Sequence, residues 1–250
     1  MKRKAKLKRV GMIGAGAIGT LIADACEKRL LPCQELVVYD FDRAATERLK
    51  AGTTFPVIVA ESFEDLLAFK PAVIVEAASQ QAAREYVPRI AKAGIELIVM
   101  STGALLQLPP QGSRVHVPSG ALGGLDALSA AALAGINEVT LTTRKNPRAL
   151  EMANKKAQTV YEGTAEEAAA RFPREMNVAA TLALTVKPVK VKVRVISDPV
   201  VERNTHEIAV KWRYGEMLLR FANDPHPVNP RTSALAAWSA IKLLQNLLEK

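Results

Sequence analysis

The sequence predicts an α/β protein: a doubly wound parallel sheet followed by a second, α+β domain with a mixed, largely antiparallel sheet. Continuous apolar runs alternate with helical segments up to residue 117, as expected for a parallel sheet that is covered on both faces. A glycine-rich turn joins the first run to the first helix, and patterns with strand alternation dominate after residue 118. The length of 250 residues also favours two domains over one.

The glycine-rich turn follows the apolar run of residues 10–13 and has the spacing GxGxxG, with Gly14, Gly16 and Gly19. Gly14 permits a tight turn, Gly16 lets the backbone approach a pyrophosphate, and Gly19 lets the helix lie close to the strand. The helix that begins here would direct free N–H groups and the positive end of its dipole at an anion. The stretch therefore predicts a Rossmann-like dinucleotide site.

Asp40 supports this prediction because it ends the next apolar run, residues 36–39, 21 positions after Gly19. A carboxylate at the tip of the second strand can accept both ribose hydroxyls of an adenosine, and it repels a 2′-phosphate, which favours NAD over NADP. Arg43, three residues further on, leaves NADP open as an alternative. A glycine turn followed by an ordinary surface aspartate is the competing interpretation.

The elements that follow complete the first domain. Ser62 and Asp65 occupy the N-cap and capping-box positions of one helix, and further helices are expected at residues 43–50 and 80–94. Small residues follow several strands at their carboxyl ends, where doubly wound sheets bind ligands, although small residues also end strands without any ligand. The expected strands are residues 57–60, 72–78, 97–100 and 114–117, and the small-residue tips are Ala77-Ala78-Ser79, Ser101-Thr102-Gly103 and Ser119-Gly120-Ala121.

The pattern changes after Pro118 to short alternating runs joined by turns such as Tyr214-Gly215, which predicts the second sheet. The last helix, residues 234–249, carries an apolar stripe that we expect to lie in the core and to return to the nucleotide domain; its members are Leu235, Trp238, Ile241, Leu244, Leu247 and Leu248. Strands are expected at 138–144, 157–161, 189–196, 205–212 and 216–221, and helices at 165–171 and 177–186. The expected parts are a basic tail (1–9), the dinucleotide-binding domain (10–118), a second α+β domain (119–228) and the C-terminal helix (229–250).

Composition excludes several classes of function. Six of the 34 basic residues lie in residues 1–9, which leaves 28 basic against 25 acidic residues in the rest, so only +3 of the net charge of +9 belongs to the body. That balance and an aromatic content of 5% argue against a nucleic-acid surface. Cys26 and Cys33 have no metal-binding spacing, so no metal site is expected, and both are expected to be reduced. No apolar run is long enough to predict a membrane span, and no signal peptide is recognisable, so we expect a cytoplasmic protein.

Removal of a hydride from an amine or alcohol requires a group that accepts a proton, and histidine suits this role near neutral pH. The chain has His116 in a strand, His226 in a proline-bracketed loop and His206 at the start of a strand in the second domain. Position favours His206, with a packed structural histidine as the alternative for either His206 or His116. An anionic substrate would also need cations or N–H groups, for which Ser119-Gly120, Gly123-Gly124, Arg203 and Asn204 are candidates.

Several segments together resemble L-aspartate dehydrogenases of the archaeal and thermophilic bacterial type. The most specific are VPSGALGGLDAL (residues 117–128) and DPVVERNTHEI (residues 198–208); the others are GAGAIG, VEAAS, STGAL and MNVAATLAL. The resemblance implies a homodimer that catalyses the reversible NAD(P)-dependent oxidative deamination of L-aspartate to iminoaspartate, and it links the imine to NAD biosynthesis. It makes residues 119–228 the catalytic and dimerisation domain, and it assigns acid–base catalysis to His206 and cofactor contacts to Ile18, Gly19, Asp40, Ala77, Ala78, Ser79, Ala121, Asn177 and Asp198. The residue pattern adds Gly14, Gly16, Ala17, Ser101 and Thr102 as candidate cofactor contacts, and Ser119, Gly120, Asn204 and His206 as candidate substrate contacts.

Alternatives to these assignments stay open at this point. Asn177 could simply cap the helix that follows it. The chain could act on a related substrate, in the manner of homoserine dehydrogenase or dihydrodipicolinate reductase. In a different class of function, it could be a regulator that binds NAD(H) without chemistry and contacts a polyanion through its basic tail.

Overall fold

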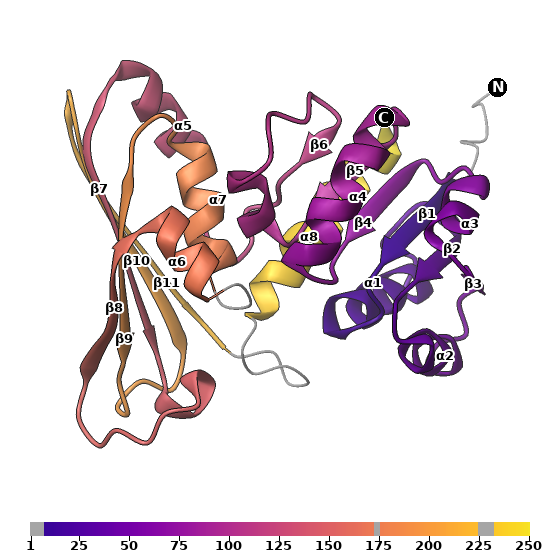
Figure 1. Cartoon of the computed structure of the whole chain (residues 1–250), viewed down its shortest axis with the longest axis horizontal. Helices are drawn as coiled ribbons and strands as arrows, with labels where there is room; N and C mark the ends of the chain where they lie inside the picture. Colours follow the sequence, from indigo (N-terminus) through magenta and orange to yellow (C-terminus); the bar gives the residue numbers. More distant parts are fainter. Residues whose placement is uncertain (1–7, 173–175, 225–232) are drawn as a thin grey trace. The chain divides into compact units, whose positions relative to one another are not determined.

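The computed structural model describes residues 8–172, 176–224 and 233–250, and the chain divides into two compact units (Figure 1). Unit 1 comprises residues 1–104, 108–118 and 240–250, and unit 2 comprises residues 105–107 and 119–239. Most of the basic tail, His226 and the start of the segment before the last helix lie outside the described residues. None of the helices in the described ranges combines the length and hydropathy that crossing a bilayer requires.

Unit 1 contains a six-stranded parallel sheet, as the sequence predicts, with the order β3-β2-β1-β4-β5-β6. The order reverses between β1 and β4, and in doubly wound sheets this switch point is where nucleotides bind. All four residues of β4 are buried, which requires cover on both faces of the sheet. The strands are β1 Lys8–Ile13, β2 Cys33–Tyr39, β3 Val57–Val59, β4 Val73–Glu76, β5 Glu96–Val99 and β6 Val115–His116.

The helices of unit 1 connect these strands in the expected alternation. The Ser62 hydroxyl accepts the N–H of Asp65 at 3.0 Å and so caps α3, but the Asp65 carboxylate accepts the N–H of Glu61 rather than that of Ser62. Cys26 and Cys33 are both buried thiols whose Sγ atoms lie 3.3 Å apart. The helices are α1 Ala17–Glu27, α2 Arg43–Ala51, α3 Phe63–Ala68 and α4 Gln80–Lys92, and the 3-10 turn η1 is Thr102–Leu106.

Unit 2 contains a five-stranded mixed sheet with the order β11-β10-β7-β9-β8, in which the pair β7–β9 is parallel and the other three pairs are antiparallel. This confirms the predicted mixed, largely antiparallel sheet. Burial alternates along β7 and β9, so one face is covered and the other is not. The strands are β7 Ile136–Lys145, β8 Gln158–Thr164, β9 Val191–Ser197, β10 Asn204–Trp212 and β11 Gly215–Asn223.

Helices α5 (Leu125–Ala134), α6 (Ala165–Arg171) and α7 (Asn177–Thr185) gather on one face of this sheet (Figure 1). Their apolar residues pack against those of the strands in a single core, and the short turn η2 (Pro147–Leu150) follows β7. The core includes Leu128, Leu182, Val139, Leu141, Val193, Ile208 and Val210. The covered face is therefore apolar along most of the length of the sheet.

The prediction that the whole apolar stripe of the last helix lies in the core is wrong for its first two members. Leu235 is 38% exposed and Trp238 is 46% exposed, whereas Ile241, Leu244, Leu247 and Leu248 are buried. The helix, α8 (Ala234–Glu249), belongs to unit 1 only from Ala240 onward, and the four buried members of the stripe all lie in that part. Leu235 and Trp238 lie in the part that is grouped with unit 2.

Candidate active site

The glycine turn of unit 1 has the geometry that its spacing predicts. Gly14 has a φ of +104°, and a Cβ atom there would lie 2.7 Å from the carbonyl oxygen of Ala77. A Cβ atom on Gly19 would lie 2.7 Å from the carbonyl oxygen of Gly14. Larger residues are therefore excluded at Gly14 by strain and contact, and at Gly19 by the close approach of α1 to the turn.

Gly16 differs from these two glycines because a Cβ atom there would meet nothing within 4 Å. It is the N-cap of α1 and, as a glycine, has no side chain that could accept the N–H groups of the first turn of that helix. An open surface over backbone N–H groups at the positive end of a helix suits a phosphate. The turn thus fits the pyrophosphate of a dinucleotide, with Ala17 and Ile18 in the first turn of the helix.

Asp40 lies at the tip of β2 and connects this tip to the glycine turn. Its carboxylate accepts the N–H of Ala15 at 2.7 Å and the N–H of Asp42 at 2.9 Å. Arg43, the residue that left NADP open, forms a two-pronged ion pair with Glu61. The guanidinium is therefore engaged by a carboxylate, while the Asp40 carboxylate stays at the edge where a ribose would bind.

A residue that the sequence analysis missed, Glu76, organises the tips of β4 and β5. Its buried carboxylate accepts the N–H groups of Ala78, Ser79 and Ser101 at 3.0 to 3.2 Å and the Ser101 hydroxyl at 2.9 Å. Burial raises the pKa of Glu76, although these hydrogen bonds act in the opposite direction. Since the two tips share one carboxylate, they are held together at the carboxyl edge of the sheet.

The remaining predicted residues of these tips also have local structural roles. The Ser79 hydroxyl caps α4 by accepting the N–H of Ala82 at 3.1 Å, and Thr102 is buried at the start of η1. A Cβ atom on Gly103 would lie 2.0 Å from the side-chain nitrogen of Gln80, so this glycine makes room for a buried amide. Ala77 and Ala78 lie beside the glycine turn, where a cofactor contact remains a prediction.

We predict that Glu76→Gln lowers stability and weakens cofactor binding together. An amide keeps the size of the side chain but turns N–H donors toward the donors that the carboxylate now accepts, which costs about 1–3 kcal/mol. Urea unfolding measures the stability, and fluorescence titration with NADH measures the affinity. Glu64→Gln, at an exposed ion pair with Arg89, is the matched control and should change both by little. Equal behaviour of the two variants would contradict the role given to Glu76.

In unit 2, the covered face of the sheet changes from apolar to polar where β7 and β9 end and β10 begins. His206 on β10 is opposite Thr143 on β7, and the Thr143 hydroxyl lies 3.0 Å from the Nδ1 atom of His206. Lys145, two residues further along β7, is opposite Ser197 of β9. Thr143, Lys145, Ser197, Asn204 and His206 are all buried, each with less than a tenth of its surface exposed.

His206 is therefore an imidazole held in an environment with little water. Burial first, and then the positive charge of Lys145, lower the pKa of His206 to about 3, so the ring is neutral at physiological pH. Because the contact with Thr143 occupies Nδ1, Nε2 is the ring nitrogen left to exchange a proton with a bound molecule. The arrangement can accept a proton, which is the role predicted for His206.

The other histidine in the described residues, His116, lies elsewhere and has a structural partner. Its Nε2 atom lies 2.5 Å from the Glu96 carboxylate, and the hydrogen bond with His116 lowers the pKa of Glu96. Glu96 begins β5, so this pair joins the start of one strand to the neighbouring edge strand. His116 thus matches the structural interpretation, and His226 is outside the described residues.

The residues predicted to bind an anionic substrate differ in their surroundings. Arg203 is largely exposed and pairs with Asp224, whereas Asn204 is buried beside the polar end of the sheet. The Gly120 N–H already donates to the Ser239 hydroxyl at 3.0 Å, and Gly123 makes room for the ring of Phe221. Gly120 and its neighbour Ser119 are half-buried, so their substrate contact stays a prediction.

Three predicted cofactor residues of unit 2 also have defined places. The carbonyl of Ala121 accepts the side-chain N–H of Asn223 at 3.1 Å. Asn177 is the first residue of α7, and Met176 occupies the cap position, which argues against the interpretation of Asn177 as a cap. The Asp198 carboxylate accepts the N–H of Val200 and pairs with Arg144 at 3.4 Å. Their contacts with a cofactor remain predictions.

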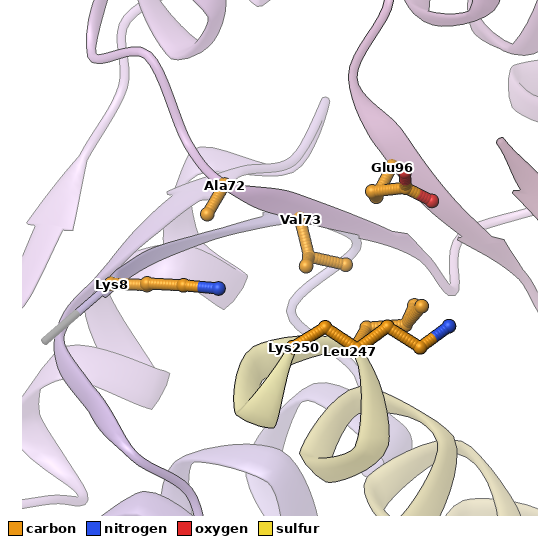
Figure 2. Close-up of a pocket in the computed structure, with 6 residues that line it drawn as sticks. All are labelled: Lys8, Ala72, Val73, Glu96, Leu247 and Lys250. Carbon is orange, nitrogen blue, oxygen red and sulfur yellow. The ribbon is translucent and has the colours of Figure 1, made fainter. Parts of the chain in front are cut away.

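A small pocket is also present in unit 1, at the amino ends of the strands of the parallel sheet (Figure 2). It is lined by the first residues of β1, β4 and β5, which are Lys8, Val73 and Glu96, together with Ala72, Leu247 and Lys250. Because ligands of doubly wound sheets bind beyond the carboxyl ends of the strands, this pocket at the amino ends is not the nucleotide site.

In the comparison with known proteins, the two parts of the chain match two different families. Residues 11–112 match the family described as homoserine dehydrogenase, NAD binding domain, and residues 126–247 match aspartate dehydrogenase, C-terminal. The chain is 41% identical to an L-aspartate dehydrogenase of Archaeoglobus fulgidus over 96% of this chain and 98% of that one. It is 39% identical to an L-aspartate dehydrogenase of Methanothermobacter thermautotrophicus over 97% of both chains.

The chain belongs to the L-aspartate dehydrogenase family. The crystal structure of the aspartate dehydrogenase from Thermotoga maritima has the same fold, with a TM-score of 0.75 and 29% identity over 96% of both chains. The homoserine dehydrogenase alternative is thus limited to the nucleotide-binding part, because the match that covers His206 and Lys145 is to the aspartate dehydrogenase C-terminal family. Membership makes the chain an oxidoreductase that uses NAD or NADP.

The depressed pKa of His206 predicts a distinct loss of stability in acid. The unfolded imidazole binds a proton below about pH 6.5, whereas the folded one resists protonation down to about pH 3. Between these values protonation favours the unfolded chain, so stability should fall as pH falls, by up to about 1.4 kcal/mol per pH unit from this group. Urea unfolding from pH 7 to 3 of the wild type and His206→Asn would test this. The two curves should diverge below pH 6, and parallel curves would contradict the assignment.

Proposed function

We propose that this protein catalyses the reversible NAD(P)-dependent oxidative deamination of L-aspartate. L-Aspartate and the oxidised cofactor give iminoaspartate, the reduced cofactor and a proton, and water then converts the imine to oxaloacetate and ammonia. The observation that carries the proposal is a buried, neutral His206 on a domain that matches the aspartate dehydrogenase C-terminal family. The names of the full-length relatives support the choice of aspartate.

In the proposed reaction, each unit contributes a separate task. When bound, the nicotinamide accepts the hydride that leaves the aspartate Cα. The glycine turn and Asp40 hold the dinucleotide, and the shared Glu76 carboxylate keeps the neighbouring tips in place. His206 accepts a proton from the substrate amine or from the water that attacks the imine, and Thr143 fixes the orientation of the ring.

The pKa of about 3 belongs to His206 without substrate, and a base is most effective when its pKa lies near the working pH. A dicarboxylate beside the imidazole brings negative charge into a site of low dielectric, which favours the protonated ring and raises its pKa. The substrate would therefore adjust the basicity of the group that acts on it.

The first experiment is oxidation of NADH and NADPH with oxaloacetate, with and without ammonia, by the wild type and by His206→Ala. We expect ammonia-dependent turnover for the wild type, and a turnover number lower by about 10²- to 10⁴-fold for the variant, with NADH affinity unchanged. Turnover without ammonia would indicate a hydroxy-acid dehydrogenase. Binding of NADH without any turnover would indicate the regulator, and full turnover by His206→Ala would remove His206 from the mechanism.

We further propose that NAD is preferred over NADP. The Asp40 carboxylate opposes a 2′-phosphate, and Arg43 is engaged with Glu61. Asp40→Asn should lower the ratio of kcat/KM for NADH to that for NADPH by at least roughly tenfold. The matched control is Asp42→Asn, at the N-cap of α2, which should leave the ratio unchanged. A ratio that does not respond to Asp40→Asn would contradict this use of the carboxylate.

Family membership also supports three wider proposals: a homodimer, a cytoplasmic location, and supply of iminoaspartate to NAD biosynthesis. The last would require that the imine leaves the enzyme before water attacks it. Sedimentation velocity tests the homodimer directly, and a monomer at micromolar concentration would contradict it.

A further inference from the structure

Lys145 is a buried cation whose charge lowers the pKa of His206 and to which no contact with substrate has been assigned so far. It is the last residue of β7 and is 2% exposed. Val139, Leu141 and Thr143 precede it at alternate positions and are all buried, so Lys145 continues the row on the covered face of the sheet. Lysine side chains usually extend into water, so burial to this extent is uncommon for a lysine.

The strand register places Lys145 at the polar end of the sheet, next to the imidazole. Its neighbour Thr143 is opposite His206 on one side, and Lys145 itself is opposite Ser197 on the other. The positive charge of Lys145 acts on the His206 ring strongly enough to oppose its protonation. An anion that reaches the His206 ring therefore also enters the field of Lys145.

Two other cations flank His206 in the register or in the sequence, and both are directed elsewhere. Arg144 is opposite Thr205, half-exposed, and pairs with Asp198. Arg203 is largely exposed and pairs with Asp224. Of these three cations, Lys145 is the one that lies on the buried face with His206.

We propose that Lys145 binds a carboxylate of the dicarboxylate substrate beside His206, an inference that rests on the proposed function. Aspartate has one carboxylate bonded to the reacting carbon and a second one carbon further away, so a group that accepts a proton from the amine on this carbon lies within a few ångströms of a carboxylate. An ammonium and a carboxylate form a charge-assisted hydrogen bond, which is strong where water is excluded. Lys145 thus orients the substrate and makes the site selective for molecules that carry a carboxylate at this position.

The test compares Lys145→Met, which keeps the length of the chain without the charge, with Lys145→Arg, which keeps the charge. Calorimetry of the NADH-loaded enzyme measures the dissociation constant for succinate, a dicarboxylate that cannot react, and kinetics give KM and kcat for oxaloacetate. We expect Lys145→Met to weaken succinate binding and raise KM by about 10- to 100-fold. Lys145→Arg should restore most of the binding, and NADH affinity should not change.

The matched control is Lys211→Met, which removes an exposed lysine from the same strand as His206. It should bind succinate as the wild type does. Thermal unfolding shows whether each variant folds; if Lys145→Met does not fold, Lys145→Gln is the uncharged variant that decides.

Two results would overturn the proposal, and they are distinguishable. A wild type with ammonia-dependent turnover and an uncharged Lys145 variant that binds succinate equally well would leave the proposed function intact and remove Lys145 from substrate binding. A wild type that neither turns over oxaloacetate with ammonia nor binds succinate would overturn the proposed function, and the role of Lys145 with it.

Discussion

The chemistry of the second unit depends on the exclusion of water from the polar end of its sheet. Strand alternation directs Thr143, Lys145 and His206 to the same face as the apolar core, so their polar groups are buried with it. Burial removes the hydration that would stabilise a protonated ring, and the nearby ammonium opposes protonation further. The fold thus keeps the imidazole neutral, and the Thr143 hydroxyl orients the ring through its contact with Nδ1.

In the nucleotide-binding unit, the key contacts fix the backbone of the glycine turn and of the strand tips, whereas in the second unit they adjust the pKa of a side chain. The glycine turn touches the tip of β4 so closely that a methyl group would not fit between them, and Glu76 ties that tip to the tip of β5. These contacts are all made within the unit, so the cradle is assembled before a dinucleotide binds. A preorganised cradle loses little conformational entropy on binding, which leaves more of the contact energy for affinity.

Both sheets could be predicted from the sequence because the apolar pattern of a strand reflects which of its faces are buried. Continuous apolar runs indicate the parallel sheet, and alternation indicates the mixed one. The glycine turn and the position of Asp40 at the tip of β2 could be predicted because both depend on a short strand–turn–helix segment. Glu76 and Lys145 were missed because a charged residue at the end of a strand normally reaches solvent, and only the tertiary packing shows that these two do not. The prediction that Trp238 is buried was wrong for the opposite reason. Helical spacing predicts an apolar stripe but not how much of the length of the helix is covered by other residues.

Proton transfer and substrate recognition are thermodynamically linked in this arrangement. If a dicarboxylate raises the pKa of His206 by binding near Lys145, then protonation of His206 must strengthen dicarboxylate binding by the same factor. The free site, with one cation and a neutral ring, carries a smaller positive charge than the site after proton transfer. In the proposed oxidation, a proton taken up by His206 would therefore strengthen the binding of the carboxylates of the imine once the hydride has left Cα, so the anionic product would stay in place while water approaches.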